Sequence, residues 1–218
     1  MHRLMDRHLL YEVLLLLSYM FYLADYVLFT DTILLLAALF IGLIIGVIIA
    51  NLFAKKFGVV QANQILLVIG AVPLILIPFI PAVIIYVCLF FAGFGLSGPL
   101  VLTNVLYAQV ADEDEVKSGV RREAAFFGTN AMLTKPAQSV AIAIGPVMLA
   151  FAGFLIEQTV QPVRAIFMIK ILMGALPGAA MLLGALILLW YPLKNSYLKE
   201  IQEKVLEMHD EKYQKLEV

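Results

Sequence analysis

Long apolar runs separated by short polar links dominate the chain. A helix needs about 20 residues to cross roughly 30 Å of hydrocarbon. Six runs meet this requirement, at about 9–29, 32–53, 62–80, 82–110, 125–156 and 165–190. The pattern therefore predicts an all-α membrane protein whose six transmembrane helices form one domain over residues 1–192. The first run is too long for a signal peptide and carries Glu12, so we expect it to be retained.

After Pro192 the pattern changes to that of an amphipathic helix. Apolar residues recur at helical spacing, and acid–base pairs stand four residues apart: Leu198, Ile201, Val205 and Met208 are the apolar positions, and Glu200–Lys204 and Glu211–Lys215 the pairs. Residues 193–218 are predicted to form a tail helix on the membrane or on the inner face of the bundle. A solvated tail without a partner is the alternative.

Lysine and arginine are distributed unequally between the two sides of the predicted bundle. Arg164 alone falls on one side, and Lys135 and Lys170 fall within spans. The other twelve lie on the side of the termini: Arg3, Arg7, Lys55, Lys56, Lys117, Arg121, Arg122, Lys194, Lys199, Lys204, Lys212 and Lys215. Since basic loops stay inside, we expect a multi-pass protein of the cell membrane with both termini in the cytoplasm.

Composition agrees with a lipid environment and narrows the chemistry. The chain is 63% hydrophobic and 14% charged, with a mean hydropathy of +0.97, so the bilayer is its expected partner. The net charge of −1 gives no reason to expect nucleic acid. A single cysteine excludes an internal disulfide, and the three histidines fall in the tails. No cofactor, metal site or enzyme activity is predicted.

Two proline positions lie near the predicted bilayer midplane. Gly98-Pro99 is about 11 residues into the fourth span, and Lys135-Pro136 about 12 residues into the fifth. Both are therefore roughly 16–18 Å deep. Because helices interrupted at matched depth mark many transporter binding sites, we predict helix breaks there. Simple packing kinks are the alternative.

Lys135 strengthens the interpretation of the fifth span as a binding site. A lysine at the bilayer centre costs about 2.5–3.5 kcal/mol on insertion scales, so we expect it to face the bundle interior. Asn130, Thr134 and Gln138 give the same span a polar stretch. These four residues are predicted to bind substrate. A lysine neutralised by a purely structural partner is the alternative.

Tyr22 and Asp25 are two further candidates, near the outer end of the first span. Tyrosine rings are good platforms for the faces of sugars, and Asp25 could line an outer vestibule. An aromatic belt at the membrane interface explains the same residues equally well.

The segment 111–123, ADEDEVKSGVRRE, is predicted to be a highly charged cytoplasmic loop. Asp112, Glu115, Arg121 and Arg122 are its candidate gating residues, because ion pairs at this mouth could break and re-form as a transporter rocks. Since an exposed pair is worth about 0–1 kcal/mol, only a network would bias the equilibrium. An ordinary solvated charge run is the alternative.

The stretch ADEDEVKSGVRREAAFFG, followed by Lys135, resembles the glycoside–pentoside–hexuronide:cation symporters, the melibiose-permease branch of the major facilitator superfamily. AKKFG at 54–58 and YPLKNSYLKEIQEKV at 191–205 extend the resemblance over nearly the whole chain. It implies the second half of a twelve-helix fold, built as a 3+3 repeat, with Lys135 near the sugar and cation sites and Arg121 in an ion pair. Gln109 and Ala124 depart from the family pattern.

The resemblance implies symport of a sugar or glycoside with sodium or protons. The coupling ion would be bound mainly by an N-terminal half that this chain does not contain. A partner half is therefore expected, as a second chain or as a homodimer mate. The alternatives are a stand-alone homodimeric carrier and a non-transporting remnant or scaffold.

Overall fold

A computed structural model describes residues 19–156, 158–192 and 195–216, and these residues contain helices and no strands. The long helices are α2 (Thr32–Phe57), α3 (Val59–Leu76), α4 (Ala82–Ser118), α5 (Glu123–Phe151), α6 (Val163–Lys170), α7 (Leu176–Ile187) and α8 (Asn195–Leu216). Short π or 3₁₀ segments are η1 (Ala24–Leu28), η2 (Ile77–Phe79), η3 (Ile171–Ala175) and η4 (Leu188–Trp190). The all-α prediction is confirmed.

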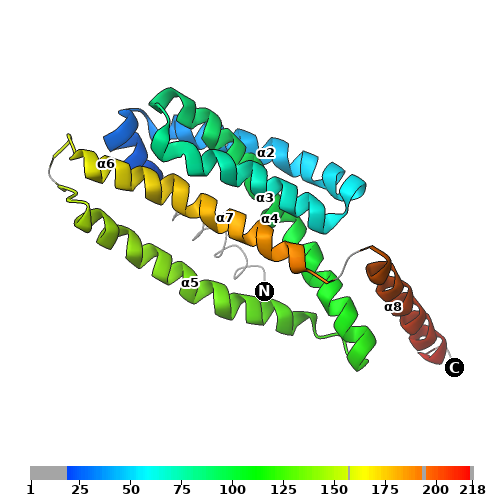
Figure 1. Ribbon diagram of the computed structural model, residues 1–218. Helices are drawn as coiled ribbons and strands as arrows, with labels where there is room; N and C mark the ends of the chain where they lie inside the picture. The colour runs from blue at the N-terminus through cyan, green and yellow to red at the C-terminus, as the bar shows by residue number, and fades with distance from the viewer. Residues whose placement is uncertain (1–18, 157, 193–194, 217–218) are drawn as a thin grey trace.

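Five helical stretches of the described residues are long and apolar enough to cross a membrane. They are Thr32–Phe57, Val59–Phe79, Ala82–Ser118, Glu123–Phe151 and Val163–Trp190, and they match five of the predicted spans. Figure 1 shows them running side by side, with α8 at one end. Of the first predicted span, residues 9–18 lie outside the described residues, and 19–28 are helical.

The tightest packing is among α2, α3 and α4, and it depends on glycine. A Cβ atom added to Gly42 of α2 would overlap the backbone of Phe90, and one added to Gly93 of α4 would overlap the backbone of Leu39. Because no side chain separates them, the two helices approach to backbone contact. Gly174 and Gly178 also give η3 and α7 close contacts with α3, although less close ones: a Cβ atom at these positions would lie 2.6 Å from the carbonyl oxygen of Leu74 and 2.9 Å from that of Ala71.

The fourth helix is longer than the sequence pattern predicted. The segment 111–123 was expected to be a loop, yet α4 continues to Ser118 and only 119–122 are non-helical. Helix formers with a Glu113–Lys117 pair sustain the last turns, and Gly119 ends them at a φ of 71°. At 37 residues α4 is about 55 Å long, so its acidic end extends beyond the hydrocarbon.

Neither of the predicted helix breaks is present. Gly98 and Pro99 lie inside the continuous helix α4, and Pro136 lies inside α5. A proline removes one hydrogen bond, and the bonds of the adjoining turns suffice to keep both helices unbroken. Gly98 instead gives close contact to α3, because a Cβ there would lie 2.7 Å from Asn63 Oδ1.

Helix α5 stands apart from this compact group (Figure 1). Its main contacts within the described residues are with α4 and α6, its neighbours in sequence. Of the residues in the most apolar 18-residue stretch of α5, 11% are buried, compared with 50% in the corresponding stretch of Val59–Phe79, which contains α3. The helix that carries the central polar residues is therefore the least covered of the five.

Candidate functional site

The polar residues in the middle of α5 occupy one stripe of the helix. Asn130, Thr134 and Gln138 stand four residues apart and are partly buried, whereas their neighbours Leu133, Ala137 and Ser139 are exposed. A four-residue spacing places side chains on one helical face. The same face continues to Gly145 and Leu149, which are buried. We refer to Asn130, Thr134 and Gln138 as the polar stripe.

The hydroxyl groups near the stripe are turned back onto their own helix. Thr134 Oγ1 donates a hydrogen bond to the carbonyl of Asn130 at 2.9 Å, and Ser139 Oγ donates to the carbonyl of Lys135 at 3.2 Å. Such bonds satisfy a polar side chain inside a membrane helix. The oxygen of Thr134 keeps lone pairs that can accept a hydrogen bond from a ligand.

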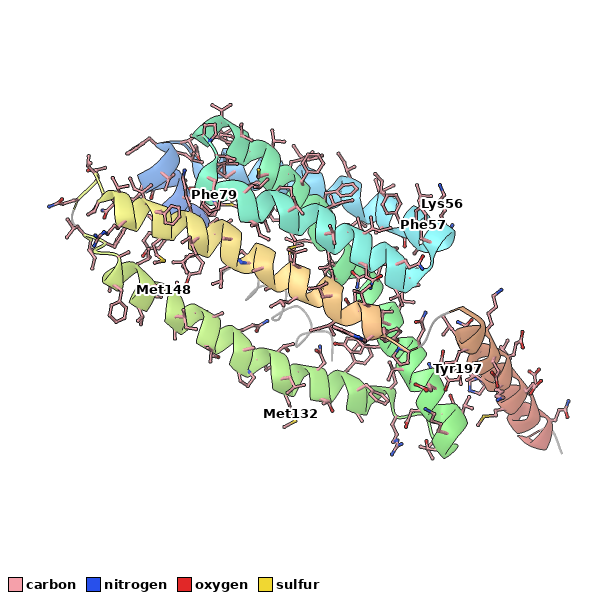
Figure 2. The ribbon with its side chains drawn as sticks, in the orientation of Figure 1. Lys56, Phe57, Phe79, Met132, Met148 and Tyr197 are labelled. Carbon is pink, nitrogen blue, oxygen red and sulfur yellow. The ribbon has the colours of Figure 1, made fainter. Side chains whose placement is uncertain are left out.

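Lys135 lies beside the polar stripe and is exposed. Within the described residues it forms no ion pair. The expectation that it faces the bundle interior with a partner is thus not met by the described helices alone. Figure 2 shows the nearby Met132 pointing away from the other helices, and that side chain is 77% exposed. Something beyond the described residues must cover Lys135 in a membrane.

Tyr22 and Asp25 lie elsewhere. Asp25 lines an open depression of about 640 Å³ together with Thr30, Asp31 and Thr159. Tyr22 packs against the ring of Phe154, with ring centres 5.4 Å apart.

That depression lies beyond the end of α5. Since α5 ends 16 residues after Lys135, the two regions are separated by about 24 Å along the helix. The six predicted substrate residues therefore do not form one site, because Tyr22 and Asp25 belong to the end of the bundle and the others to its middle.

Three of the four candidate gating residues, Asp112, Glu115 and Arg121, are in contact at the other end, and the fourth, Arg122, follows Arg121 and pairs with a different acid. Arg121 contacts Asp112 at 2.9 Å and Glu115 at 3.3 Å, and it also contacts Glu123 at 3.2 Å. Arg122 pairs with Asp114 at 2.6 Å. Because α4 stays helical to Ser118, Asp112 and Glu115 fall on one face, where a single guanidinium reaches both. We call Asp112, Glu115, Arg121 and Arg122 the ionic cluster.

Charge partners shift the pKa values of the groups around the ionic cluster. The hydrogen bond from Arg122 holds the pKa of Asp114 below its ordinary value. The hydrogen bond from Lys117 does the same to the pKa of Glu113, with a further contribution from Tyr197. Burial alone would lower the pKa of Arg121, but its acidic partners outweigh burial and raise it. All these groups are therefore charged at neutral pH.

Helix α8 packs against the acidic end of α4, in keeping with the expectation that the tail helix lies on the bundle, and it adds two polar contacts there that were not predicted. Tyr197, which is labelled in Figure 2, donates from its hydroxyl to Glu113 at 2.9 Å, and His209 Nε2 lies 3.1 Å from Glu115. Ile201 and Val205 are buried between them. These four residues recur every four positions and so share one face of α8; the sequence pattern had identified Ile201 and Val205 on that face but not Tyr197 and His209.

The described chain is a helical membrane protein with a polar stripe at mid-depth and an ionic cluster at one end. A family model described as MFS/sugar transport protein matches residues 9–195. The chain belongs to this family, and the fold is consistent with half of a major facilitator.

Individual relatives are transporters by name. The chain is 25% identical over 152 residues to the sphingosine-1-phosphate transporter MFSD2B of Xenopus tropicalis, covering 69% of the chain and 30% of that relative. It is 28% identical over 148 residues to the sodium-dependent lysophosphatidylcholine symporter 1-B of Danio rerio, covering 66% and 28%. An uncharacterised symporter of Synechocystis is 24% identical over 127 residues, covering 56% and 23%. The chain thus spans less than a third of each relative.

Proposed function

We propose that this chain is one half of a cation-coupled secondary transporter, equivalent to the second six helices of a melibiose-permease-like symporter. The observation that carries the proposal is the polar stripe with Lys135 on a helix that the rest of the described chain leaves largely uncovered. Polar groups at mid-depth are tolerated where they line a cavity or meet protein. A substrate pathway between two bundles meets both conditions.

A partner bundle is part of this proposal. Alternating access in this fold needs two bundles that rock about a shared central site. The partner is either a separate N-terminal half or a second copy of this chain. The charge distribution supports an orientation in which the ionic cluster and both termini face the cytoplasm of the cell. A remnant that does not transport is the competing proposal.

A sugar or glycoside is the first candidate substrate. Asn130 and Gln138 offer amide donors and acceptors, and Thr134 offers an acceptor, which suits the hydroxyl groups of a sugar. The description of the matched family also names sugar transport. Because the chain resembles cation symporters, we propose that a sodium or proton gradient drives this transport.

A lysophospholipid is the second candidate, supported by the names of two relatives and by the surface around the stripe. Leu133, Val140 and Ile144 beside the stripe are exposed apolar side chains. A phosphate could pair with Lys135 while an acyl chain lies along these residues. A sugar has no acyl chain to lie along these apolar side chains. Substitutions at them should therefore affect transport of a lysophospholipid and not transport of a sugar, which distinguishes the two candidates.

Reconstitution tests both the function and the need for a partner. The molecular mass of the purified chain in detergent would give its oligomeric state. The chain would then be reconstituted into liposomes with and without an N-terminal half, and uptake of labelled glycosides and of lysophosphatidylcholine would be measured. We expect accumulation under a sodium or proton gradient only in a two-bundle assembly. Liposomes without a gradient are the control. Gradient-driven accumulation by a strictly monomeric chain would overturn the half-transporter proposal.

A further inference from the structure

The open depression of about 640 Å³ lies at the end of the bundle opposite the ionic cluster (Figure 1). Two stretches that are far apart in sequence form its walls. One is η1 with the turn that joins it to α2, and the other is the 152–162 link between α5 and α6. The depression is separated from Lys135 by about 24 Å along α5. It is therefore a place for a ligand in its own right.

Two of the side chains that line the depression are carboxylates, those of Asp25 and Asp31. Asp25 forms no ion pair within the described residues. Asp31 uses its Oδ1 atom at the start of α2, where it accepts a hydrogen bond from the backbone N–H of Ile33 at 2.9 Å. Arg164, the basic residue on this side of the predicted bundle, pairs with neither acid in the described part of the chain. The depression thus presents negative charge that no basic side chain of the described residues contacts.

Two aromatic rings line the same space. The ring of Tyr26 is held by Phe154, which lies nearly perpendicular to it with ring centres 5.1 Å apart. Phe29 has a φ of 50°, which bulky residues rarely adopt, and its side chain is 67% exposed. The faces of such rings attract a cation within about 6 Å of the ring centre, and several rings together recognise quaternary ammonium groups. The rings and the carboxylates therefore favour the same class of ligand.

The lining suits an organic cation better than a metal ion or a sugar. Among the described residues, no three acidic, histidine or cysteine side chains lie close enough together to hold a metal ion. A volume of about 640 Å³ is in the range of sites for small molecules. A neutral sugar could use the hydroxyl groups of Thr30 and Thr159, but it would leave the two carboxylates without a counter-charge. An ammonium ion supplies that charge.

We propose that this depression binds an organic ammonium ion, such as one that carries a trimethylammonium group. Asp25 and Asp31 supply the negative charge, and the rings of Tyr26 and Phe29 supply faces for the methyl groups. The binding does not depend on whether the chain transports. If the chain carries a lysophospholipid, the depression is also a first contact for a choline head group on the predicted outer side, and that role rests on the proposed function.

Protection of a cysteine from labelling tests the binding. With Cys88 replaced by alanine, Thr159→Cys places a thiol in the lining, and its rate of reaction with an uncharged maleimide is measured in the purified full chain. We expect tetramethylammonium chloride to slow this reaction several-fold, and sodium chloride of equal ionic strength to have little effect. A cysteine at Ser118, at the other end of the bundle, is the control and should react at an unchanged rate. Equal protection by glucose, by sodium chloride or by calcium chloride would overturn the proposal.

Substitutions in the lining test which groups hold the cation. Asp25→Asn and Asp31→Asn remove charge but keep an oxygen, so the cap of α2 is retained, and Phe29→Leu removes a ring. Each should raise the tetramethylammonium concentration for half-protection about two- to five-fold, as expected for an exposed ion pair or cation–π contact. The matched controls are Asp210→Asn on the exposed surface of α8 and Phe79→Leu at a ring that is 74% exposed and labelled in Figure 2.

Thermal unfolding midpoints equal to that of the parent protein verify that the variants fold. Half-protection at the parent concentration in all three lining variants would overturn the proposal, and so would equal shifts in the two controls. Because no step measures uptake, failure here is distinct from failure of the proposed function.

Discussion

The guanidinium of Arg121 lies 3.3 Å from the carboxylate of Glu115, a side chain that is 2% exposed. Glu115 also lies 3.1 Å from His209 of α8. One buried carboxylate thus connects α4, the 119–122 turn and the tail helix. A buried charge left without a partner is costly, so this contact differs from an ordinary surface pair.

Replacing Arg121 should destabilise the protein more than replacing Arg122. Arg121→Ala removes the guanidinium from the buried carboxylate of Glu115, at a cost of about 1–3 kcal/mol, as for a buried group that loses a charged hydrogen-bond partner. Arg122→Ala removes a more exposed pair with Asp114 and should have little effect. Thermal unfolding in detergent gives both values. Equal midpoints for the two variants would show that burial of Glu115 does not matter.

If the ionic cluster gates transport, reversing its central charge should change exchange rates rather than affinity. Arg121→Glu replaces the shared cation with a fourth acid beside Asp112, Glu115 and Glu123, which disfavours the closed end of the bundle. Exchange between the two access states, measured in the reconstituted assembly, should change several-fold while the ligand dissociation constant stays nearly constant. Lys117→Glu, on an exposed side chain, is the matched control. A collapse of affinity with unchanged exchange would assign the cluster a different role.

Removing the central cation should abolish uptake without preventing insertion. Lys135→Ala in the transporting assembly is expected to reduce the initial rate at least about ten-fold, equivalent to about 1.4 kcal/mol. Met132→Ala, at a side chain of the same helix that is 77% exposed and points away from the other helices, is the control. Initial uptake at equal membrane expression is the measurement. Normal transport by Lys135→Ala would make the lysine structural.

Acid should loosen the junction of α4 and α8. The pKa of Asp114 lies below its ordinary 3.8 and that of Glu113 below its ordinary 4.5. Both are lowered on folding, so their stabilisation is present above these ordinary values and is lost as pH falls through the lowered ones. Protection of the amides at 111–122 and 195–210 against hydrogen exchange, relative to the intrinsic exchange rate at each pH, should therefore fall at pH values below those ordinary ones. In Glu113→Gln this acid response should be weaker.

Labelling from the two sides of the membrane tests the predicted orientation. With Cys88 replaced, a cysteine at Ser118 should react from the cytoplasm and one at Thr159 from outside, because basic loops remain inside. Both positions are accessible at opposite ends of the bundle (Figure 1). Reaction of both from the same side would exclude the topology.

The sequence by itself determined the helical class and the approximate spans. Hydrocarbon imposes a minimum length on every crossing helix. Each apolar run of the sequence meets that minimum, and the last of them ends at Trp190. Local spacing also identified the tail helix and the charges that form the ionic cluster, because Arg121 and Arg122 are near their acids in sequence. The boundary at 111 was misplaced, since charge ends a membrane span without ending a helix.

Only the tertiary structure decided which surfaces meet. Hydropathy does not encode the rotation of a helix about its axis or its register against a neighbour. The docking of Tyr197 and His209 on α4 therefore followed from folding alone, as did the separation of Asp25 from Lys135. Nor did the sequence show that α5 is the least buried of the five long helices in the part of the chain that the structure describes. Packing decides this, because glycine contacts draw α2, α3 and α4 together and leave α5 at the side.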